Sequence, residues 1–288
     1  SDISVLLQGE SGTGKEMVAN LLHKWSNRRD GPFVVIDCGS TQPSLLESEL
    51  FGHVKGAFTH AVQDKKGLIE TADQGTLFLD EVGNISAEMQ TRLLRFLQER
   101  TVRRVGSNGF TQVNCRVLAA TNADLSQMVA AGTFREDLYY RLKAVQLKVP
   151  SLRRRIEDLP LLVNHFLVDI SRRNGMNRPH ISEGAMQIMR SYSWPGNVRE
   201  LYNMLEAGAL LCSNGTIQPG DLQIDEAVNT RADNSTTLSL AESERQAVVK
   251  ALEETGWVRK KAAQALGISR RAIHYKIRKH NIGDGGGT

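Results

Sequence analysis

The sequence predicts an α/β domain built on a parallel sheet, followed by two smaller all-α domains. Up to about residue 150, short apolar runs typical of strands alternate with segments of helical periodicity, which indicates a sheet covered by helices on both faces. Beyond Pro150 the strand-like runs stop and helical periodicity dominates. A stretch rich in Asn, Thr, Asp and Ala then reads as a linker. We therefore expect domains at residues 1–155, 156–226 and 239–288, with a linker at 227–238.

Composition excludes a membrane protein and a disulfide-rich one. Of the 288 residues 40% are hydrophobic, enough to bury substantial cores. No apolar run approaches the roughly 18 residues that a membrane span needs, and the first residues resemble neither a signal nor a transit peptide. We expect a cytoplasmic protein. Because the chain begins without Met and almost on a strand, we also expect that a natural N-terminal part precedes it. Cys38, Cys115 and Cys212 lie far apart without a metal-binding spacing, which favours reduced core residues.

A glycine-rich loop stands between the first predicted strand (residues 3–7) and the first predicted helix (residues 17–22). Glycines permit the tight turns that point successive backbone N–H groups at phosphate oxygens, and a lysine supplies a cation. The following helix dipole also favours an anion. We predict a phosphate-binding loop, and the alternative is an ordinary glycine-rich turn. Glu16 stands where a Ser or Thr hydroxyl would usually meet the metal. The loop consists of Gly9, Glu10, Ser11, Gly12, Thr13, Gly14 and Lys15.

Two further predicted strands end in polar side chains. The run of residues 75–81 ends in Asp80 and Glu81, and the run of residues 116–122 ends in Asn122. Because the C-terminal ends of parallel strands share one edge, we expect these side chains beside the phosphate-binding loop. There Asp80 would hold Mg²⁺ through water, and Glu81 would orient or deprotonate the attacking water. The alternative is that the pair is only the polar end of a strand.

The C-terminal segment is strongly basic. Between Trp257 and His280 the sequence has eight Lys or Arg residues and no Asp or Glu. Residues 260–266 and 270–280 have helical periodicity and are separated at Gly267, which is typical of a helix-turn-helix that binds double-stranded DNA. The alternative is a solvated basic face. The second helix would be capped by Ser269, would reach base edges through Arg270, Arg271 and His274, and would meet phosphates through Lys276, Arg278 and Lys279.

Several long motifs together resemble the bacterial enhancer-binding proteins, the AAA+ activators of sigma-54 RNA polymerase. The resemblance implies an AAA+ P-loop NTPase fold, with a parallel sheet between helices, an all-α lid and a C-terminal Fis-type helix-turn-helix. The motifs are GESGTGKE at 9–16, which resembles Walker A; ESELFGHVKGAFTHA at 47–61, the sigma-contacting loop; GTLFLDEVG at 75–83, Walker B; GTFREDLYYRL at 132–142, the arginine-finger segment; and WPGNVREL at 194–201, the sensor II helix.

The resemblance also implies roles for the nucleotide-site residues. Residues 9–16, Glu16 included, would bind ATP, with Lys15 on the β- and γ-phosphates. Asp80 would bind Mg²⁺ and Glu81 the hydrolytic water. Asn122 would sense the γ-phosphate, and Arg199 would couple the nucleotide state to the lid.

The same resemblance implies an assembly and two macromolecular partners. Arg135 and Arg141 would reach into the neighbouring subunit's site, within a hexameric ring assembled from dimers. The tail would bind an upstream, enhancer-type DNA site, which implies a nucleoid-associated bacterial protein. The loop that would contact sigma-54 holoenzyme consists of Gly56, Ala57, Phe58, Thr59, His60 and Ala61.

Two residues depart from the family pattern. His60 stands where the family usually has Gly, and it adopts positive φ less readily and adds bulk. Asp37 stands where the family commonly has an Asn that hydrogen-bonds the Walker B Glu, and a carboxylate would tend to repel Glu81. The leading hypothesis is an ATP-hydrolysing activator that remodels sigma-54 polymerase. The alternative is a nucleotide- and DNA-binding regulator that acts with the housekeeping sigma factor or as a repressor, with reduced or dispensable hydrolysis.

Overall fold

The computed structural model describes residues 2–40, 42–59, 61–212, 214–223, 248–249, 251–252, 255–266 and 270–279. The chain separates into two compact units, residues 1–224 and 225–288, and each is described by itself. In the described part of the chain, no helix is long and apolar enough to span a membrane.

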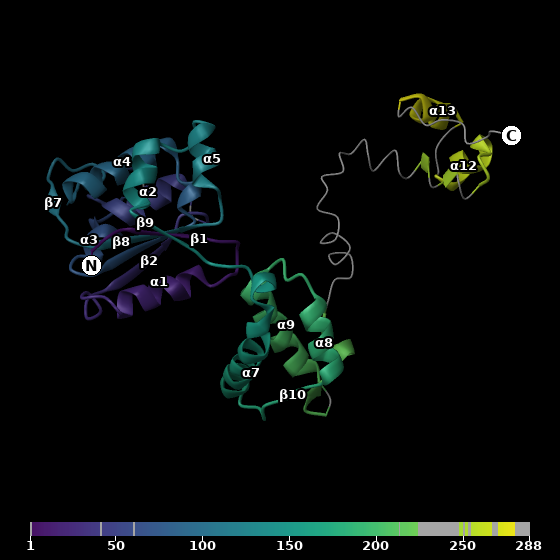
Figure 1. Ribbon diagram of the computed structural model, residues 1–288. Coiled ribbons are helices and arrows are strands. Elements are labelled where there is room, and N and C mark those ends of the chain that lie inside the picture. The colour runs from purple at the N-terminus through teal and green to yellow at the C-terminus, as the bar shows by residue number, and fades with distance from the viewer. Residues whose placement is uncertain are drawn as a thin grey trace. The chain divides into compact units, whose positions relative to one another are not determined.

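A five-stranded, all-parallel sheet forms the centre of the first unit (Figure 1). The strand order is β2-β5-β8-β1-β9, so β1 lies between two strands that come much later in the sequence. Strands β1, β5 and β8 match the predicted runs of residues 3–7, 75–81 and 116–122, whereas the edge strand β9 was not predicted. The strands are β1 (Val5–Gln8), β2 (Phe33–Asp37), β5 (Thr76–Asp80), β8 (Arg116–Thr121) and β9 (Val145–Lys148).

Alternate side chains of the central strands enter two separate cores. Leu6, Leu77 and Leu79 face a large cluster that includes residues of α2, α3, α4 and α6. Their strand neighbours Leu7 and Phe78 face a smaller cluster under α1. Figure 1 shows α1 on one side of the sheet and α2 and α4 on the other. The helices are α1 (Lys15–Lys24), α2 (Pro43–Phe51), α3 (Leu68–Thr71), α4 (Ala87–Glu99), α5 (Leu125–Ala130) and α6 (Glu136–Leu142).

Two short antiparallel ladders lie beyond the sheet, next to the predicted sigma-contacting loop. One pairs β3 (Gly52–His53) with β4 (Lys65–Lys66), at the base of that loop. The other pairs β6 (Thr101–Val102) with β7 (Thr111–Gln112). The two are joined, because Val54 N–H donates to the Val105 carbonyl and Val105 N–H donates to the Gly52 carbonyl.

Residues 152–222 form the lid around one hydrophobic core centred on Trp194 and Leu201. The sequence predicts an all-helical lid, and this prediction is wrong in one detail. The lid also contains a short parallel pair, in which β10 (His180–Ile181) pairs with β11 (Thr216–Ile217). Each strand is only two residues long, and Ile217 is the one fully buried residue among the four. The sequence therefore has no alternating pattern that would predict these strands. The helices are α7 (Leu159–Asn174), α8 (Glu183–Ser191) and α9 (Asn197–Leu211), with single 3-10 turns at Leu152–Arg154, Ile156–Asp158 and Pro219–Asp221, and a fourth in the first domain at Val82–Asn84.

In the second unit, α12 (Arg259–Ala265) and α13 (Arg270–Lys279) pack against each other. Ala262 and Ile273 meet in a small core that also includes Val248 and Leu252. This agrees with the predicted pair of short helices.

Cys38 and Cys115 are buried free thiols, as expected, and Cys212 is half-buried. Burial raises the pKa of the Cys38 thiol to about 12 and that of Cys115 to about 11. Both therefore stay protonated and unreactive near neutral pH.

A buried histidine links α1 to the sheet. His23 is 5% exposed, and its Nδ1 lies 2.9 Å from the Thr76 hydroxyl at the start of β5. Burial, with the nearby Arg116 and Lys24 cations, lowers the pKa of His23. The folded domain therefore holds a neutral imidazole.

The free energy of unfolding should decrease at acidic pH because of His23. The unfolded chain, in which His titrates near pH 6.5, binds a proton more readily than the folded chain. The contribution of His23 is therefore fully present above about pH 6.5 and is lost as pH falls through the lowered folded-state pKa. Urea unfolding over a pH series measures it, with His23→Gln as a variant that cannot titrate there. An identical pH dependence in both proteins would contradict this assignment.

Candidate functional site

The predicted phosphate-binding loop connects β1 to α1 in a tightly turned conformation. Gly14, directly before α1, has φ +97°, and Gly12 has φ +75°, both in the region that favours glycine. Gly12 also lies against the lid, since a Cβ at this position would come 2.2 Å from the Gly196 carbonyl oxygen. The backbone therefore requires glycine at these two positions.

Lys15 lies inside the loop that it follows. Its side chain is 6% exposed, and Nζ donates to the carbonyls of Gly9 at 3.0 Å and Glu10 at 3.2 Å. The same Nζ lies 3.8 Å from Oε1 of Glu81. The structure thus brings together a cation and a carboxylate that the sequence placed 66 residues apart.

Asp80 and Glu81 lie at the C-terminal edge of β5, as predicted. Asp80 Oδ1 accepts from the Glu81 backbone N–H at 3.0 Å. Glu81 has φ +52°, an uncommon conformation for a residue other than glycine. The Asn122 backbone N–H donates to Glu81 Oε2 at 3.3 Å, so the end of β8 also contacts this carboxylate.

A pocket of about 530 Å³ lies between the loop and the lid. Its wall is largely polar on the loop side and includes aromatic rings on the lid side, with Phe166 of α7 and Tyr202 of α9 in edge-to-face contact at 5.4 Å. The Tyr202 hydroxyl is buried without a hydrogen-bond partner among the described residues. The loop side is lined by Ser11, Gly12, Gly14, Lys15 and Glu16, with Asp80 and Glu81 beside them and Arg199 opposite.

This donor set fits a nucleoside triphosphate. Convergent N–H groups and a lysine suit phosphates, the aromatic rings suit a flat base, and the Tyr202 hydroxyl lacks a partner that a ligand could supply. The described residues include no cluster of three or more His, Cys, Asp or Glu side chains able to hold a metal on its own. A Mg²⁺ ion held by Asp80 through water, together with phosphate oxygens, remains a prediction.

Hydrogen bonds within the loop and from the lid support the other predicted loop residues. The Thr13 hydroxyl donates to the Glu10 carbonyl at 2.8 Å. The Glu10 carboxylate accepts from Arg153 at 2.8 Å and from Asn197 at 3.2 Å, and these two donors lower its pKa. Arg199 donates to the Ser11 hydroxyl at 3.2 Å. Sequence reasoning missed Arg153, Asn197 and Tyr202; for Asn197, the only signal was its place in the WPGN chain break.

Arg135 and Arg141 do not line this pocket in their own chain. Arg135 is exposed and pairs with Asp137 at 2.7 Å, which lowers the pKa of that carboxyl. Arg141 donates to the Leu97 carbonyl of α4 at 3.1 Å. The buried Gln90 of α4 holds the segment in place, because its Oε1 accepts from the Arg135 backbone N–H at 2.8 Å.

The predicted sigma-contacting loop is anchored at its base and presents an aromatic ring. Phe58 is 41% exposed and stacks edge-on against His53 at 4.9 Å, and His53 Nδ1 lies 2.7 Å from the Ser48 hydroxyl. Gly56 N–H donates to the Ala61 carbonyl, which closes the loop. Ala57 and Thr59 belong to the same loop, whereas His60 lies outside the described residues.

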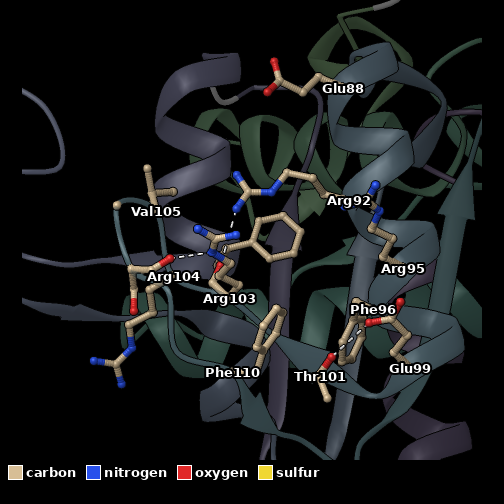
Figure 2. Close-up of a pocket in the computed structure, with 13 residues that line it drawn as sticks. Glu88, Arg92, Arg95, Phe96, Glu99, Thr101, Arg103, Arg104, Val105 and Phe110 are labelled. Carbon is tan, nitrogen blue, oxygen red and sulfur yellow. Dashed lines mark hydrogen bonds between the residues drawn. The ribbon is translucent and has the colours of Figure 1, made fainter.

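A second pocket, of about 580 Å³, lies beside this loop, between α4 and the β6–β7 segment (Figure 2). Two of its arginines, Arg92 and Arg104, already have partners. Arg92 reaches from α4 toward Arg103 (Figure 2) and donates to the Arg103 carbonyl. It also pairs with Glu47 and covers the Phe51 ring at 4.5 Å. Arg104 makes two 2.8 Å hydrogen bonds to Glu70. These contacts hold the β6–β7 segment, which is hydrogen-bonded to the base of the sigma-contacting loop.

Asp37 lies at the end of β2, level with Asp80. Its Oδ1 accepts from the backbone N–H of Gly39 at 2.7 Å and Ser40 at 3.3 Å. Hydrogen bonds from Ser40 and Gly39 lower the pKa of Asp37, so it stays ionised. Its expected repulsion of Glu81 remains a prediction.

The predicted DNA-contacting residues fall mostly on α13. His274 is exposed and Lys276 is half-buried. The backbone of α13 also includes the other predicted residues, Arg270, Arg271, Arg278 and Lys279. Ser269, the predicted cap, lies outside the described residues, as do Gly267 and the linker at 227–238. The individual DNA contacts therefore remain predictions.

Three family models match the chain in succession. They are the sigma-54 interaction domain at residues 1–148, the AAA+ ATPase lid domain at 153–239, and the bacterial regulatory protein, Fis family, at 239–280.

Curated relatives match over nearly the whole chain. The response regulator protein PilR of Pseudomonas aeruginosa is 44% identical, with 98% of this chain and 65% of PilR covered. The transcriptional regulatory protein ZraR of Salmonella typhi is 47% identical, with 96% of this chain and 63% of ZraR covered. The chain thus spans slightly less than two thirds of the length of these relatives.

A solved structure agrees with the fold. NtrX from Brucella abortus, determined in complex with ADP, superposes with a TM-score of 0.72 at 30% identity, covering 98% of this chain and 65% of NtrX. NtrX has also been determined in complex with ATP. The P-loop, the paired acids of β5, the lid and the three consecutive family matches lead to one conclusion: this chain belongs to the sigma-54 interaction domain family, the AAA+ transcriptional regulators with a Fis-type helix-turn-helix.

Proposed function

We propose that this protein is an ATP-hydrolysing transcriptional activator that binds DNA through its tail and remodels sigma-54 RNA polymerase at promoters. The observation that carries the proposal is the cluster of Lys15, Asp80 and Glu81 in one pocket between a phosphate-binding loop and a lid. Family membership supports the DNA and sigma-54 partners.

In the proposed mechanism the protein contributes positioning and charge. Lys15 and the loop N–H groups would hold the phosphates, and Asp80 would hold Mg²⁺ through water. Bound ATP supplies the phosphoryl group and its Mg²⁺ the neutralising charge. The Glu81 carboxylate accepts a proton from, or orients, the attacking water, and its contacts to Lys15 and Asn122 N–H fix its position.

The proposed mechanism also requires a neighbouring subunit. Arg135 and Arg141 are outside the pocket of their own chain, while both are fastened to α4, Arg135 through Gln90 and Arg141 through the Leu97 carbonyl. Guanidinium groups placed at the next subunit's phosphates would stabilise transition-state charge, an effect of about 10³–10⁵-fold in rate. Assembly into a ring, which we expect to be hexameric, would complete each site.

Glu81→Gln should abolish hydrolysis but preserve ATP binding. The amide cannot accept the proton from water, so we expect turnover to decrease by about 10²–10⁴-fold, while Lys15 loses its carboxylate neighbour and stays available to phosphate. Phosphate release and ATP titration calorimetry measure the two quantities, with exposed Glu88→Gln as the control. Undiminished turnover would refute the assignment of Glu81.

A mixing experiment should show that Arg135 acts across subunits. Arg135→Ala and Glu81→Gln proteins should each be inactive, because each lacks one half of every site. Mixed rings should regain activity, since an Arg135→Ala subunit with an intact Glu81 can receive an arginine from a Glu81→Gln neighbour. Asp137→Asn, which removes only the partner of Arg135 in its own chain, is the control. Mixed rings as inactive as the parents would contradict action in trans.

Transcription in vitro with sigma-54 holoenzyme tests the output. We expect open complexes with ATP and none with a non-hydrolysable analogue. His60→Gly should increase the yield, because glycine accepts positive φ and restores the usual family residue. If ATP hydrolysis is measured but no ATP-dependent open complex forms, the alternative of a regulator acting with another sigma factor or as a repressor takes its place.

A further inference from the structure

The first residue of the lid helix α9 touches the phosphate-binding loop. Asn197 is completely buried and has φ +53°, a left-handed conformation that Asn tolerates better than most residues. The turn before it is held by Glu200, whose carboxylate accepts from Gly196 N–H at 2.7 Å and from the Tyr192 hydroxyl at 2.9 Å. The position of Asn197 is therefore fixed from the lid side.

The Asn197 amide joins three separate segments. Its Oδ1 accepts from the Leu152 N–H at 2.8 Å, at the point where the lid begins. Its Nδ2 donates to the Ser11 carbonyl at 3.0 Å and to Glu10 Oε2 at 3.2 Å. A side chain with both an acceptor and donors is required here, because a backbone N–H, a backbone carbonyl and a carboxylate must all be satisfied.

The backbone after Asn197 continues the contact. Val198 N–H and Arg199 N–H both donate to the Gly12 carbonyl, at 2.9 and 3.2 Å. These are N–H groups of the first turn of α9, which have no partner within the helix. The lid helix therefore uses its free donors to bind the loop.

Peptide geometry gives these contacts a consequence for phosphate binding. A trans peptide unit is planar, and its N–H points opposite to its C=O. Hydrogen bonds that hold the Ser11 and Gly12 carbonyls toward the lid thus fix the Gly12 and Thr13 N–H groups in the opposite direction. Phosphate-binding loops depend on such successive N–H groups.

We propose that Asn197 is a positioning residue: its side chain orients the phosphate-binding N–H group of Gly12 by holding the Ser11 carbonyl on the outer side of the loop, and the N–H groups of Val198 and Arg199 that follow it do the same for Thr13 by holding the Gly12 carbonyl. The proposal rests on the proposed nucleotide function of this loop. It assigns to the lid a second link to nucleotide, separate from the direct contact expected of Arg199. A change in the position of the lid would then change the direction of the N–H groups in the loop.

ADP affinity, measured by calorimetry, tests the proposal with two variants. Asn197→Gly keeps the left-handed backbone but removes every side-chain contact. Asn197→Asp keeps the shape but places a carboxylate next to that of Glu10 and removes the donor to Ser11. We expect ADP to bind at least about 10-fold more weakly to both, the loss typical of a hydrogen bond involving a charged group.

Two further measurements separate positioning from general loss of structure. Adding Glu10→Gln to Asn197→Asp should restore part of the affinity, because it removes the repulsion. Hydrogen exchange of residues 9–15 should be faster in Asn197→Gly, while β5 exchanges as in the wild type. Asn174→Asp, which loses an amide contact within α7 only, should bind ADP normally.

The outcomes distinguish this inference from the function on which it rests. If the wild type fails to bind ADP, the proposed nucleotide function is wrong. If the wild type binds ADP and both Asn197 variants bind it equally well with unchanged exchange of residues 9–15, the positioning role is refuted. Uniformly faster exchange across the whole first unit would show a structural role only, and would also overturn the proposal.

Discussion

A phosphate-binding loop must keep several backbone N–H groups directed at one point, and the rest of the first unit is arranged to satisfy that constraint. Because those N–H groups must stay free for the phosphate, the shape of the loop has to be held by hydrogen bonds to its carbonyls and side chains. The Thr13 hydroxyl and the Lys15 ammonium bind carbonyls within the loop, and the lid binds carbonyls on its outer side. β1 and α1 hold its two ends at the sheet edge where Asp80 and Glu81 also lie.

Much of this arrangement could be predicted from the sequence, because it depends on local patterns. The apolar runs of β1, β5 and β8 are buried on both faces, so they are continuous and easily recognised. Their parallel arrangement then places Asp80, Glu81 and Asn122 beside Lys15, as the structure confirms for Lys15 and Glu81 and for Glu81 and the Asn122 backbone. The short helices of the tail were predictable from Gly267 and from periodicity.

The features that sequence reasoning missed are those set by long-range contacts. β9 is an edge strand whose apolar–polar alternation, Val-Gln-Leu-Lys, spans only four residues and whose apolar side chains stay exposed, so its pairing with β1 is what defines it. β10 and β11 are defined by two residues each. Asn197 and Arg153 contact residues more than 140 positions earlier, and no local pattern encodes such a distance. Glu10 is predicted to bind nucleotide together with the rest of its motif, whereas its carboxylate contacts Arg153 and Asn197 of the lid.

Helix α4 links three parts of the molecule that are remote in sequence. It begins just after Glu81, its Gln90 holds the Arg135 segment, and its Arg92 braces the ladders that carry Phe58. A rigid helix of 13 residues is roughly 20 Å long, so a tilt of about 10° at one end would move the other by about 3 Å. If α4 behaves as a rigid rod, a rearrangement near Glu81 would displace the Arg135 segment and the ladders beside Phe58 together, because Gln90 and Arg92, which contact them, lie only two positions apart on the helix.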